Sequence, residues 1–302
     1  MRKKSDHSKR NRLAQYKTIN ALDLAREYYA EELRAVANLQ SEPVVKAFAK
    51  VPREHFLGPG PWQILSPGFE YWTTNDADPT HVYHNVLVAI DAERRLNNGH
   101  PSFLAFLIEQ LELQPGERVV HVGCGTGYYT ALMAEVVGRE GHVLAVEIDA
   151  ELARRAQDNL SYLPQVQVVT GDGGEVDAAP NDAILINAGA THPRSVWLDS
   201  LRLGGRLLLP LTVIEDADRG GGGRVLKVTR QSRGLTARFI SEVGIFSCMG
   251  ARAPELNERL KEAFMRGEWK CVQSLRREPH EQDDTCWLHT RDFCLSKSAI
   301  PD

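Results

Sequence analysis

Apolar runs of strand length alternate with segments of helix length through the middle of this chain, and this alternation constrains the fold more than any other feature. The predicted elements are helix 103–111, strand 118–122, helix 128–137, strand 142–147, helix 150–162, strands 166–170 and 182–187, helix 194–201 and strand 206–210. Strands separated by helices form a parallel sheet with helices on both faces. We therefore expect a Rossmann-like, doubly wound α/β fold.

The residues before this alternation have a different character. Apolar residues recur at spacings of three and four over 22–39, which predicts an amphipathic helix, and a short second helix is expected over 44–49. Residues 52–101 are rich in Pro, Gly, Trp, Asn and His and predict an ordered loop with one strand, at 86–90. Long irregular segments in compact domains often carry function, so we expect substrate contacts here, the alternative being a loop that only covers the scaffold.

The alternation of strand-length and helix-length segments ends at residue 210. Gly220 to Gly223 predict a flexible turn, and strands over 225–229 and 235–243 then form a hairpin-like, antiparallel edge of the sheet. Leu256, Leu260 and Phe264 lie on one face of a predicted amphipathic helix. The polar stretch that follows ends in Cys286-Trp287-Leu288-His289, and its sequence indicates no chemistry.

Charge and apolar content exclude some classes of partner. The 302 residues carry a formal net charge of -4, which disfavours a nucleic-acid partner because such proteins usually show a basic surplus. No stretch approaches the roughly 18 apolar residues that span a bilayer, and the basic start leads into no apolar signal core. We expect a cytoplasmic protein without a membrane partner.

The cysteines favour free thiols over a metal site. Their number, 5, is odd, and none form the Cys-x-x-Cys pair that is typical of zinc sites. His81 and His84 could begin a metal site, but no thiolate or carboxylate follows at ligand spacing. The sequence therefore predicts reduced cysteines and no metal.

A glycine-rich turn, Gly123-Cys124-Gly125-Thr126-Gly127, joins the first strand of the alternation to its helix. Glycine lets the backbone turn tightly and approach a ligand, and free N–H groups at a helix start favour a carboxylate or phosphate. A dinucleotide fingerprint would need glycine at position 128, where this chain has Tyr128. The spacing therefore favours S-adenosylmethionine over NAD, with its amino-acid end at the turn.

Polar residues follow the next three predicted strands, where ligands bind in open α/β sheets. Glu147 can accept the ribose hydroxyls, and Ile148 beside it is assigned to the same site. Asp172, with Gly173, can bind the adenine amine, although either acid alone would also suit a helix cap or a solvated charge. Asn187 and Ala188 should border the sulfonium and the substrate, which makes Asn187 a candidate catalytic residue as well.

Four segments of the chain match the motifs of one enzyme family in order. They are Val51-Pro52-Arg53-Glu54-His55-Phe56, then Val122 to Tyr128, then Gly171-Asp172-Gly173, then Leu203-Gly204-Gly205-Arg206-Leu207. Over about residues 25–250 the chain thus resembles the protein-L-isoaspartate O-methyltransferase family. The resemblance implies an S-adenosylmethionine-dependent O-methyltransferase that acts on the α-carboxylate of an L-isoaspartyl residue in a protein or peptide. Because a carboxylate is already ionised at neutral pH, such a reaction needs alignment and no general base.

The acceptor side departs from this family. The family carries an Ile-Ser-x-Pro or Ile-Thr-x-Pro element ahead of the first core helix, and here Asn98-Gly99-His100-Pro101 occupies that place. The upstream pattern Tyr-x-Asp-x-Pro-Leu is replaced by Tyr83-His84-Asn85-Val86-Leu87. His100 is the candidate catalytic residue that could replace the missing hydroxyl as a donor or base, and a purely structural histidine is the alternative. We expect Ser102 to cap the next helix.

Three hypotheses about function follow. The first is a carboxyl methyltransferase for aspartyl or isoaspartyl residues, and the second is a methyltransferase of the same fold with another small-molecule or peptide acceptor. The third is a non-catalytic module that binds S-adenosylmethionine. The predicted parts are a disordered basic tail (1–15), helices with a substrate-side loop region (16–100), a cofactor-binding methyltransferase domain (101–250) and a C-terminal extension (251–302).

Overall fold

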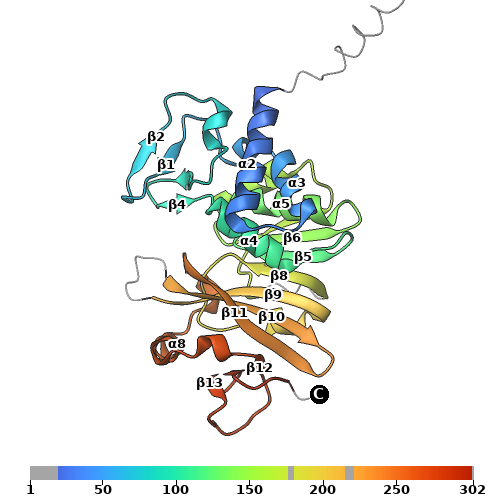
Figure 1. Ribbon diagram of the computed structural model, residues 1–302, viewed down its shortest axis with the longest axis vertical. Coiled ribbons are helices and arrows are strands. Elements are labelled where there is room, and N and C mark those ends of the chain that lie inside the picture. The colour runs from blue at the N-terminus through green and yellow to red at the C-terminus, as the bar shows by residue number, and fades with distance from the viewer. Residues whose placement is uncertain (1–19, 176–179, 215–220, 301–302) are drawn as a thin grey trace, which may run out of the picture. The chain divides into compact units, whose positions relative to one another are not determined.

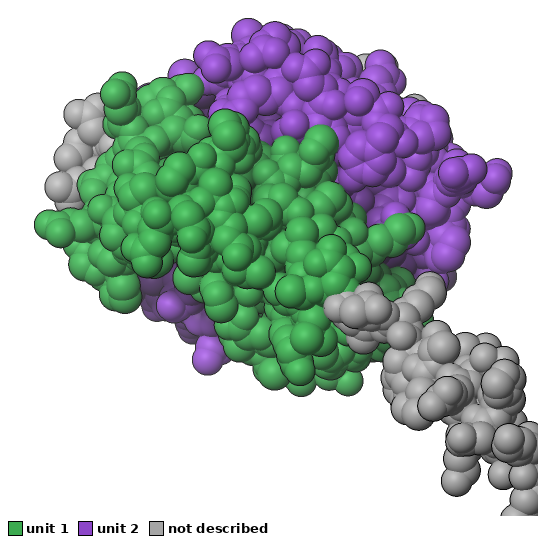
Figure 2. All heavy atoms as spheres, turned by 90° about the horizontal axis from the view of Figure 1, so that it is seen from above, with its two compact units in different colours: residues 1–102 green, residues 103–302 purple. Residues whose placement is uncertain are grey.

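The computed structural model describes residues 20–175, 180–214 and 221–300 (Figure 1). The chain divides into two compact units, residues 1–102 and residues 103–302, which Figure 2 colours separately. The predicted tail, residues 1–15, lies outside the described residues, and the four-part division of the chain stays a prediction. Among the described helices, none is both long and apolar enough to cross a membrane.

Two helices open the first unit, as predicted. Helix α2 (Ala21–Ala37) begins after Asn20, whose side chain accepts a hydrogen bond from the backbone N–H of Leu22. Helix α3 (Glu42–Lys50) begins after Ser41, which caps Val44 in the same way. These caps satisfy N–H groups that a helix start leaves unpaired.

The prediction of one strand in residues 52–101 was wrong. The segment contains the 3-10 helices η1 (Arg53–Phe56) and η2 (Pro79–Val82) and the strands β1 (Gln63–Leu65), β2 (Tyr71–Thr73), β3 (Ala89–Asp91) and β4 (Leu96–Asn97). The strands form two antiparallel pairs, β1 with β2 and β3 with β4. Strands of two or three residues are too short to show the alternation of apolar and polar residues that identifies a strand.

A sheet of 10 strands forms the second unit, in the order β13-β14-β12-β11-β10-β9-β8-β5-β6-β7. Its parallel half comprises β5 (Arg118–Val122), β6 (His142–Glu147), β7 (Val166–Thr170), β8 (Asn181–Ile186) and the start of β9 (Leu201–Val213). Helix α4 (Pro101–Leu111) precedes β5, and the helices that connect the parallel strands are α5 (Tyr128–Val137), α6 (Ala150–Leu160) and α7 (Ser195–Asp199). The predicted Rossmann-like α/β fold is confirmed.

The antiparallel half is larger than the hairpin that the sequence predicts. Strand β10 (Gly221–Gln231) pairs with both β9 and β11 (Gly234–Ile245), and β12 (Ser274–Arg276), β13 (Cys286–His289) and β14 (Cys294–Ser296) extend the sheet beyond them. Helix α8 (Pro254–Arg266) contributes Leu260 and Ala263 to the core on this side (Figure 1).

The predicted turn at Gly220 to Gly223 is corrected in its described part. Gly221 to Gly223 belong to β10, while Gly220 lies outside the described residues. A Cβ atom at Gly223 would lie 2.0 Å from the carbonyl oxygen of Leu211, so Gly223 lets strand β9 approach closely.

Candidate active site

The order of the parallel strands reverses at β5, which lies between β6 and β8. Connections therefore leave β5 and β8 toward opposite sides, and such a switch point is where open α/β sheets bind ligands. The loops after the two strands meet here, because the backbone N–H of Asn187 donates to the carbonyl of Val122 at 2.8 Å. The Asn187 side chain also donates to the carbonyl of Gly123, at 3.3 Å. The fold thus brings two predicted site segments together.

The turn after β5 depends on its three glycines. Gly123, Gly125 and Gly127 have φ angles of 76°, 57° and 97°, in the left-handed region that other residues rarely adopt. A Cβ atom at Gly127 would lie 2.7 Å from Cδ1 of Leu160. The glycines therefore fix the path of the turn, and Gly127 lets it pack closely against Leu160.

Glu147 is anchored beside this turn at the end of β6. Its side chain is buried, and one carboxylate oxygen accepts from the backbone N–H of Gly125 at 2.7 Å while the other accepts from that of Asp149 at 3.1 Å. Each oxygen keeps a further lone pair for a ligand. Ile148, next in the chain, is 52% exposed and offers an apolar surface at the same strand end.

Cys124 and Thr126 contribute backbone to the turn, since both side chains are buried. Burial, and then the nearby Glu147, raises the pKa of the Cys124 thiol, which keeps it protonated and unreactive. The carbonyl of Thr126 accepts a hydrogen bond from the side chain of Asn159 at 2.9 Å. Asn159, on α6, is a supporting residue that no sequence motif indicated.

Asp172 and Gly173 follow β7 and are held by different contacts. The Asp172 carboxylate accepts from the backbone N–H of Gly174 at 2.8 Å. The carbonyl of Gly173 accepts from the indole of Trp197 at 2.7 Å, and a Cβ atom there would lie 2.3 Å from a methyl group of Val122. Gly173 is thus required for close packing, while Asp172 is the polar group at this strand end.

Residues 246–251, which follow β11, border the same strand ends, although no sequence motif predicted them there. The backbone N–H of Gly189 donates to the carbonyl of Phe246 at 2.7 Å, and that of Cys248 donates to the carbonyl of Gly189 at 2.8 Å. A Cβ atom at Gly250 would lie 1.8 Å from an oxygen of Asp172. No motif in the sequence predicts this contact, because it depends on where an antiparallel strand far along the chain ends.

His100 belongs to the first unit, immediately before α4. Its Nδ1 lies 3.2 Å from the hydroxyl of Ser102, and partial burial followed by the positive charge of Arg53 lowers the pKa of His100. The ring is therefore neutral at pH 7. Ser102 is the second residue of α4 and does not cap it, since the Asn85 side chain binds the Ser102 backbone N–H at 2.9 Å.

Arg53, in the Val-Pro-Arg-Glu motif, is fully buried in the first unit. Its guanidinium donates to the carbonyls of Val82, His84 and Val86 at 2.7, 2.9 and 2.8 Å. This motif therefore holds the segment in which the chain departs from the family pattern. His81, predicted not to bind a metal, lies 2.8 Å from an oxygen of Asp76.

A doubly wound sheet with a glycine turn at its switch point and an anchored acid at the end of the next strand defines a Rossmann-like methyltransferase. The family model described as "Protein-L-isoaspartate(D-aspartate) O-methyltransferase (PCMT)" matches residues 70–233. The chain belongs to this family.

Individual relatives agree with the family model. The protein-L-isoaspartate O-methyltransferase of Ignicoccus hospitalis is 34% identical over 183 residues, which are 59% of this chain and 78% of that protein. Protein-L-isoaspartate O-methyltransferase 1 of Archaeoglobus fulgidus is 35% identical over 193 residues, which are 63% and 80% of the two chains. The enzyme of that name from Aeropyrum pernix is 32% identical over 231 residues, or 73% of this chain and 80% of the other.

Solved structures give the same fold. A protein-L-isoaspartate O-methyltransferase has a TM-score of 0.61 and 26% identity, covering 80% of this chain and 69% of that one. A structure titled as a putative enzyme of this kind from Plasmodium falciparum, in complex with S-adenosyl-L-homocysteine, has a TM-score of 0.56 and 18% identity. It covers 74% of this chain and 98% of that one.

Proposed function

We propose that this protein transfers the methyl group of S-adenosylmethionine to a carboxylate of a protein or peptide, with an isoaspartyl or aspartyl residue as acceptor. The observation that carries the proposal is the anchored carboxylate of Glu147, which the backbone of Gly125 and Asp149 holds beside a glycine turn at the switch point. Membership of the family supports the choice of acceptor.

The residues at the strand ends fit this cofactor. Glu147 would accept the ribose hydroxyls, and Ile148 presents an exposed apolar side chain on which a flat adenine ring can pack. Asp172 with Gly173 would bind the adenine amine, and the backbone of the turn from Gly123 to Gly127 would border the amino-acid end. Asn187 and Ala188 would border the sulfonium and the acceptor. S-adenosylmethionine, when bound, supplies an electrophilic methyl group.

Methyl transfer to a carboxylate requires few catalytic groups from the protein. A carboxylate is ionised at neutral pH, so the residues around it have to orient one oxygen and exclude water. His100, neutral because its pKa is lowered, would donate a hydrogen bond to that carboxylate without carrying a charge of its own. We propose this positioning role for His100.

We also propose a cytoplasmic location for the protein. The described cysteines form no disulfide, which supports this location.

One observation favours a second candidate, a methyltransferase of the same fold with a different acceptor. Gly99 stands where the family pattern has a hydroxyl residue, and its φ of 77° lies in the left-handed region. A serine or threonine at this position would be strained. The acceptor segment therefore follows a backbone path that the family's hydroxyl residue does not suit.

Methyl transfer from labelled S-adenosylmethionine to an isoaspartyl peptide tests the proposal, with the matching aspartyl peptide as control. We expect base-labile label on the isoaspartyl peptide and a lower turnover number for His100→Gln at unchanged cofactor affinity. Cofactor binding by calorimetry without label on either peptide would refute the carboxyl acceptor and favour the second candidate. Absence of cofactor binding would refute the methyltransferase assignment itself.

A further inference from the structure

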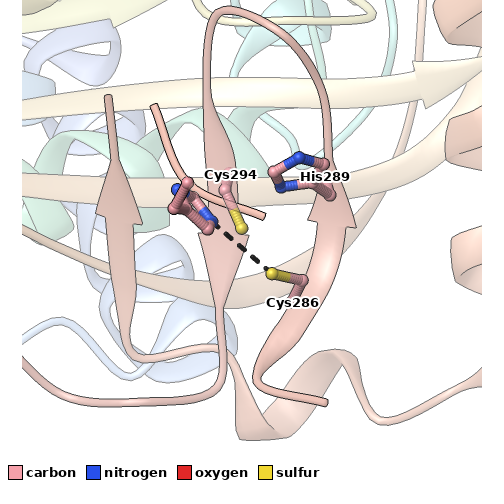
Figure 3. A group of neighbouring side chains, drawn as sticks. Cys286, His289 and Cys294 are labelled. Atoms are coloured by element: carbon pink, nitrogen blue, oxygen red, sulfur yellow. Dashed lines mark hydrogen bonds between the residues drawn. The ribbon is translucent and has the colours of Figure 1, made fainter. Parts of the chain in front are cut away.

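Four side chains of the C-terminal region point toward one another in the second unit. Figure 3 shows Cys286 and His289 on β13 and Cys294 on β14 around one point, and the dashed line joins the Cys286 sulfur to His280. One ligand atom from each residue lies within 4.8 Å of every other. These residues lie beyond the family-model match, which ends at residue 233. We propose that His280, Cys286, His289 and Cys294 form a structural zinc site.

The strand register explains how these residues meet. His289 and Cys294 are cross-strand partners in the antiparallel pair of β13 and β14. Residues three apart in a regular strand, such as Cys286 and His289, point to opposite faces. A bulge in β13, between Cys286 and Leu288, shifts the register, and both side chains reach the same face.

The spacing of the atoms suits a tetrahedral metal. Ligands at about 2.0 to 2.3 Å from zinc lie about 3.3 to 3.8 Å from one another. The Cys286 sulfur and Nε2 of His280 are already 3.6 Å apart. Closing the other distances requires movements of about 1 Å or less, which are within reach of side-chain torsions. Two sulfurs with two imidazoles favour zinc over oxygen-seeking cations such as Mg²⁺ or Ca²⁺.

The surrounding groups orient the histidines and a cysteine as metal ligands need. Nδ1 of His280 lies 2.8 Å from the carbonyl oxygen of Glu278, so it carries the proton and leaves Nε2 free for the metal. The backbone N–H of Asp283 donates to the Cys286 sulfur at 3.5 Å, which orients this sulfur. Nδ1 of His289 is buried without a hydrogen-bond partner, and a metal bound by this nitrogen would supply one.

Four protein ligands leave no open position, so the site is structural. It would tie the segment before β13 to the β13–β14 hairpin, whose strands are only four and three residues long. Trp287, Leu288 and Leu295 of this hairpin are buried in the core, and a metal would link the polar segment before β13 to it. No metal was expected because the sequence has no Cys-x-x-Cys pair and no ligand follows His81 and His84 at a suitable spacing, whereas the pair here is Cys286-x-x-His289.

Elemental analysis of the full chain, produced without a metal-binding tag, tests the site. We expect roughly one zinc ion per chain in the wild type and in Cys271→Ser, which removes an exposed cysteine outside the cluster. Cys286→Ser and Cys294→Ser should lose the metal on gel filtration. Retention of zinc by a variant that carries both substitutions would place the metal elsewhere and overturn the proposal.

Cobalt substitution of the wild type keeps the test independent of whether a variant folds. Cobalt in this cluster should give the intense visible bands of tetrahedral coordination and a thiolate charge-transfer band of two sulfur ligands. Cys271→Ser should give the same spectrum. A wild-type protein that takes up neither zinc nor cobalt, or that joins Cys286 to Cys294 in a disulfide under reducing purification, would overturn the site.

Discussion

The two halves of the large sheet place their polar side chains in different ways. In the parallel half, the groups that we assign to the cofactor, such as Glu147 and Asp172, stand just where a strand ends and the chain turns toward a helix. In the antiparallel half, Cys286 and Cys294 lie within a hairpin, and a bulge decides which face they share. The first arrangement depends on local chain geometry and the second on register between strands.

Metal removal should have the largest effect, and it should change the antiparallel half of the sheet without changing cofactor binding by the parallel half. A chelator strong enough to strip the proposed zinc should lower the thermal midpoint by on the order of 10 °C, because metal binding contributes to folding free energy. Cofactor affinity by calorimetry at low temperature should stay within about twofold, a change worth roughly 0.4 kcal/mol. If affinity instead falls in parallel with zinc loss, the halves are coupled and the comparison fails.

The replacement Glu147→Gln should instead weaken cofactor binding and leave the proposed zinc site unchanged. Losing charged hydrogen bonds of about 1.5–3 kcal/mol should weaken S-adenosylmethionine binding roughly 10- to 100-fold. Zinc content should not change. Glu151→Gln, in the first turn of α6, is the matched control and should bind the cofactor like the wild type. Equal losses in both variants would indicate a general charge effect and no contact at Glu147.

Acid should weaken the parallel half through His121, which burial keeps neutral by lowering its pKa to about 3. In the unfolded chain His121 binds a proton near pH 6.5. The contribution of the neutral side chain to the free energy of unfolding is therefore complete above that pH. It is lost as the pH falls toward 3, by about 1.4 kcal/mol per pH unit. Urea unfolding of His121→Asn between pH 7 and 5 should show a shallower dependence than wild type. The control His84→Asn, at an exposed histidine, should keep the wild-type slope.

The smallest expected effect concerns the cap of α6, next to the cofactor site. The Asp149 side chain accepts from the backbone N–H groups of Glu151 and Leu152 at 3.0 and 3.1 Å, so Asp149→Ala should cost about 1 kcal/mol of unfolding free energy. Asp158→Ala, which removes only an exposed ion pair with Arg154, should cost about 0.4 kcal/mol. Equal costs for the two would show that the cap contributes nothing beyond surface charge.

These differences explain how much the sequence could predict. The observed bounds of β5, β6, β7 and α5 are the predicted ones, because each element begins or ends at a local signal such as the glycine turn. The start of β9 was missed, since the strand begins at Leu201, where the apolar run of the preceding helix ends.

Some residues of the candidate sites could be predicted from the sequence, and others could not. The sequence predicted that Gly125, Glu147 and Asp172 lie near one another because parallel strands bring their carboxyl ends to one edge regardless of the rest of the chain. It could not identify Phe246 beside Gly189, Gly250 beside Asp172, or the approach of His280 to Cys286. Those contacts depend on the path of β11 and on a bulge in β13, and neither leaves a pattern in neighbouring residues.

The strand order of the C-terminal region has a consequence for synthesis on the ribosome. Strand β14, the last of the sheet in sequence, lies between β12 and β13, which precede it. The edge of β11 at Leu235 and Thr236 can pair with β12 once Ser274 and Leu275 have emerged, but β12 itself stays open until residues 294–296 arrive. A nascent chain thus carries an unpaired sheet edge until residues 294–296 have left the exit tunnel, and that interval is when it is most exposed to pairing with a neighbouring chain.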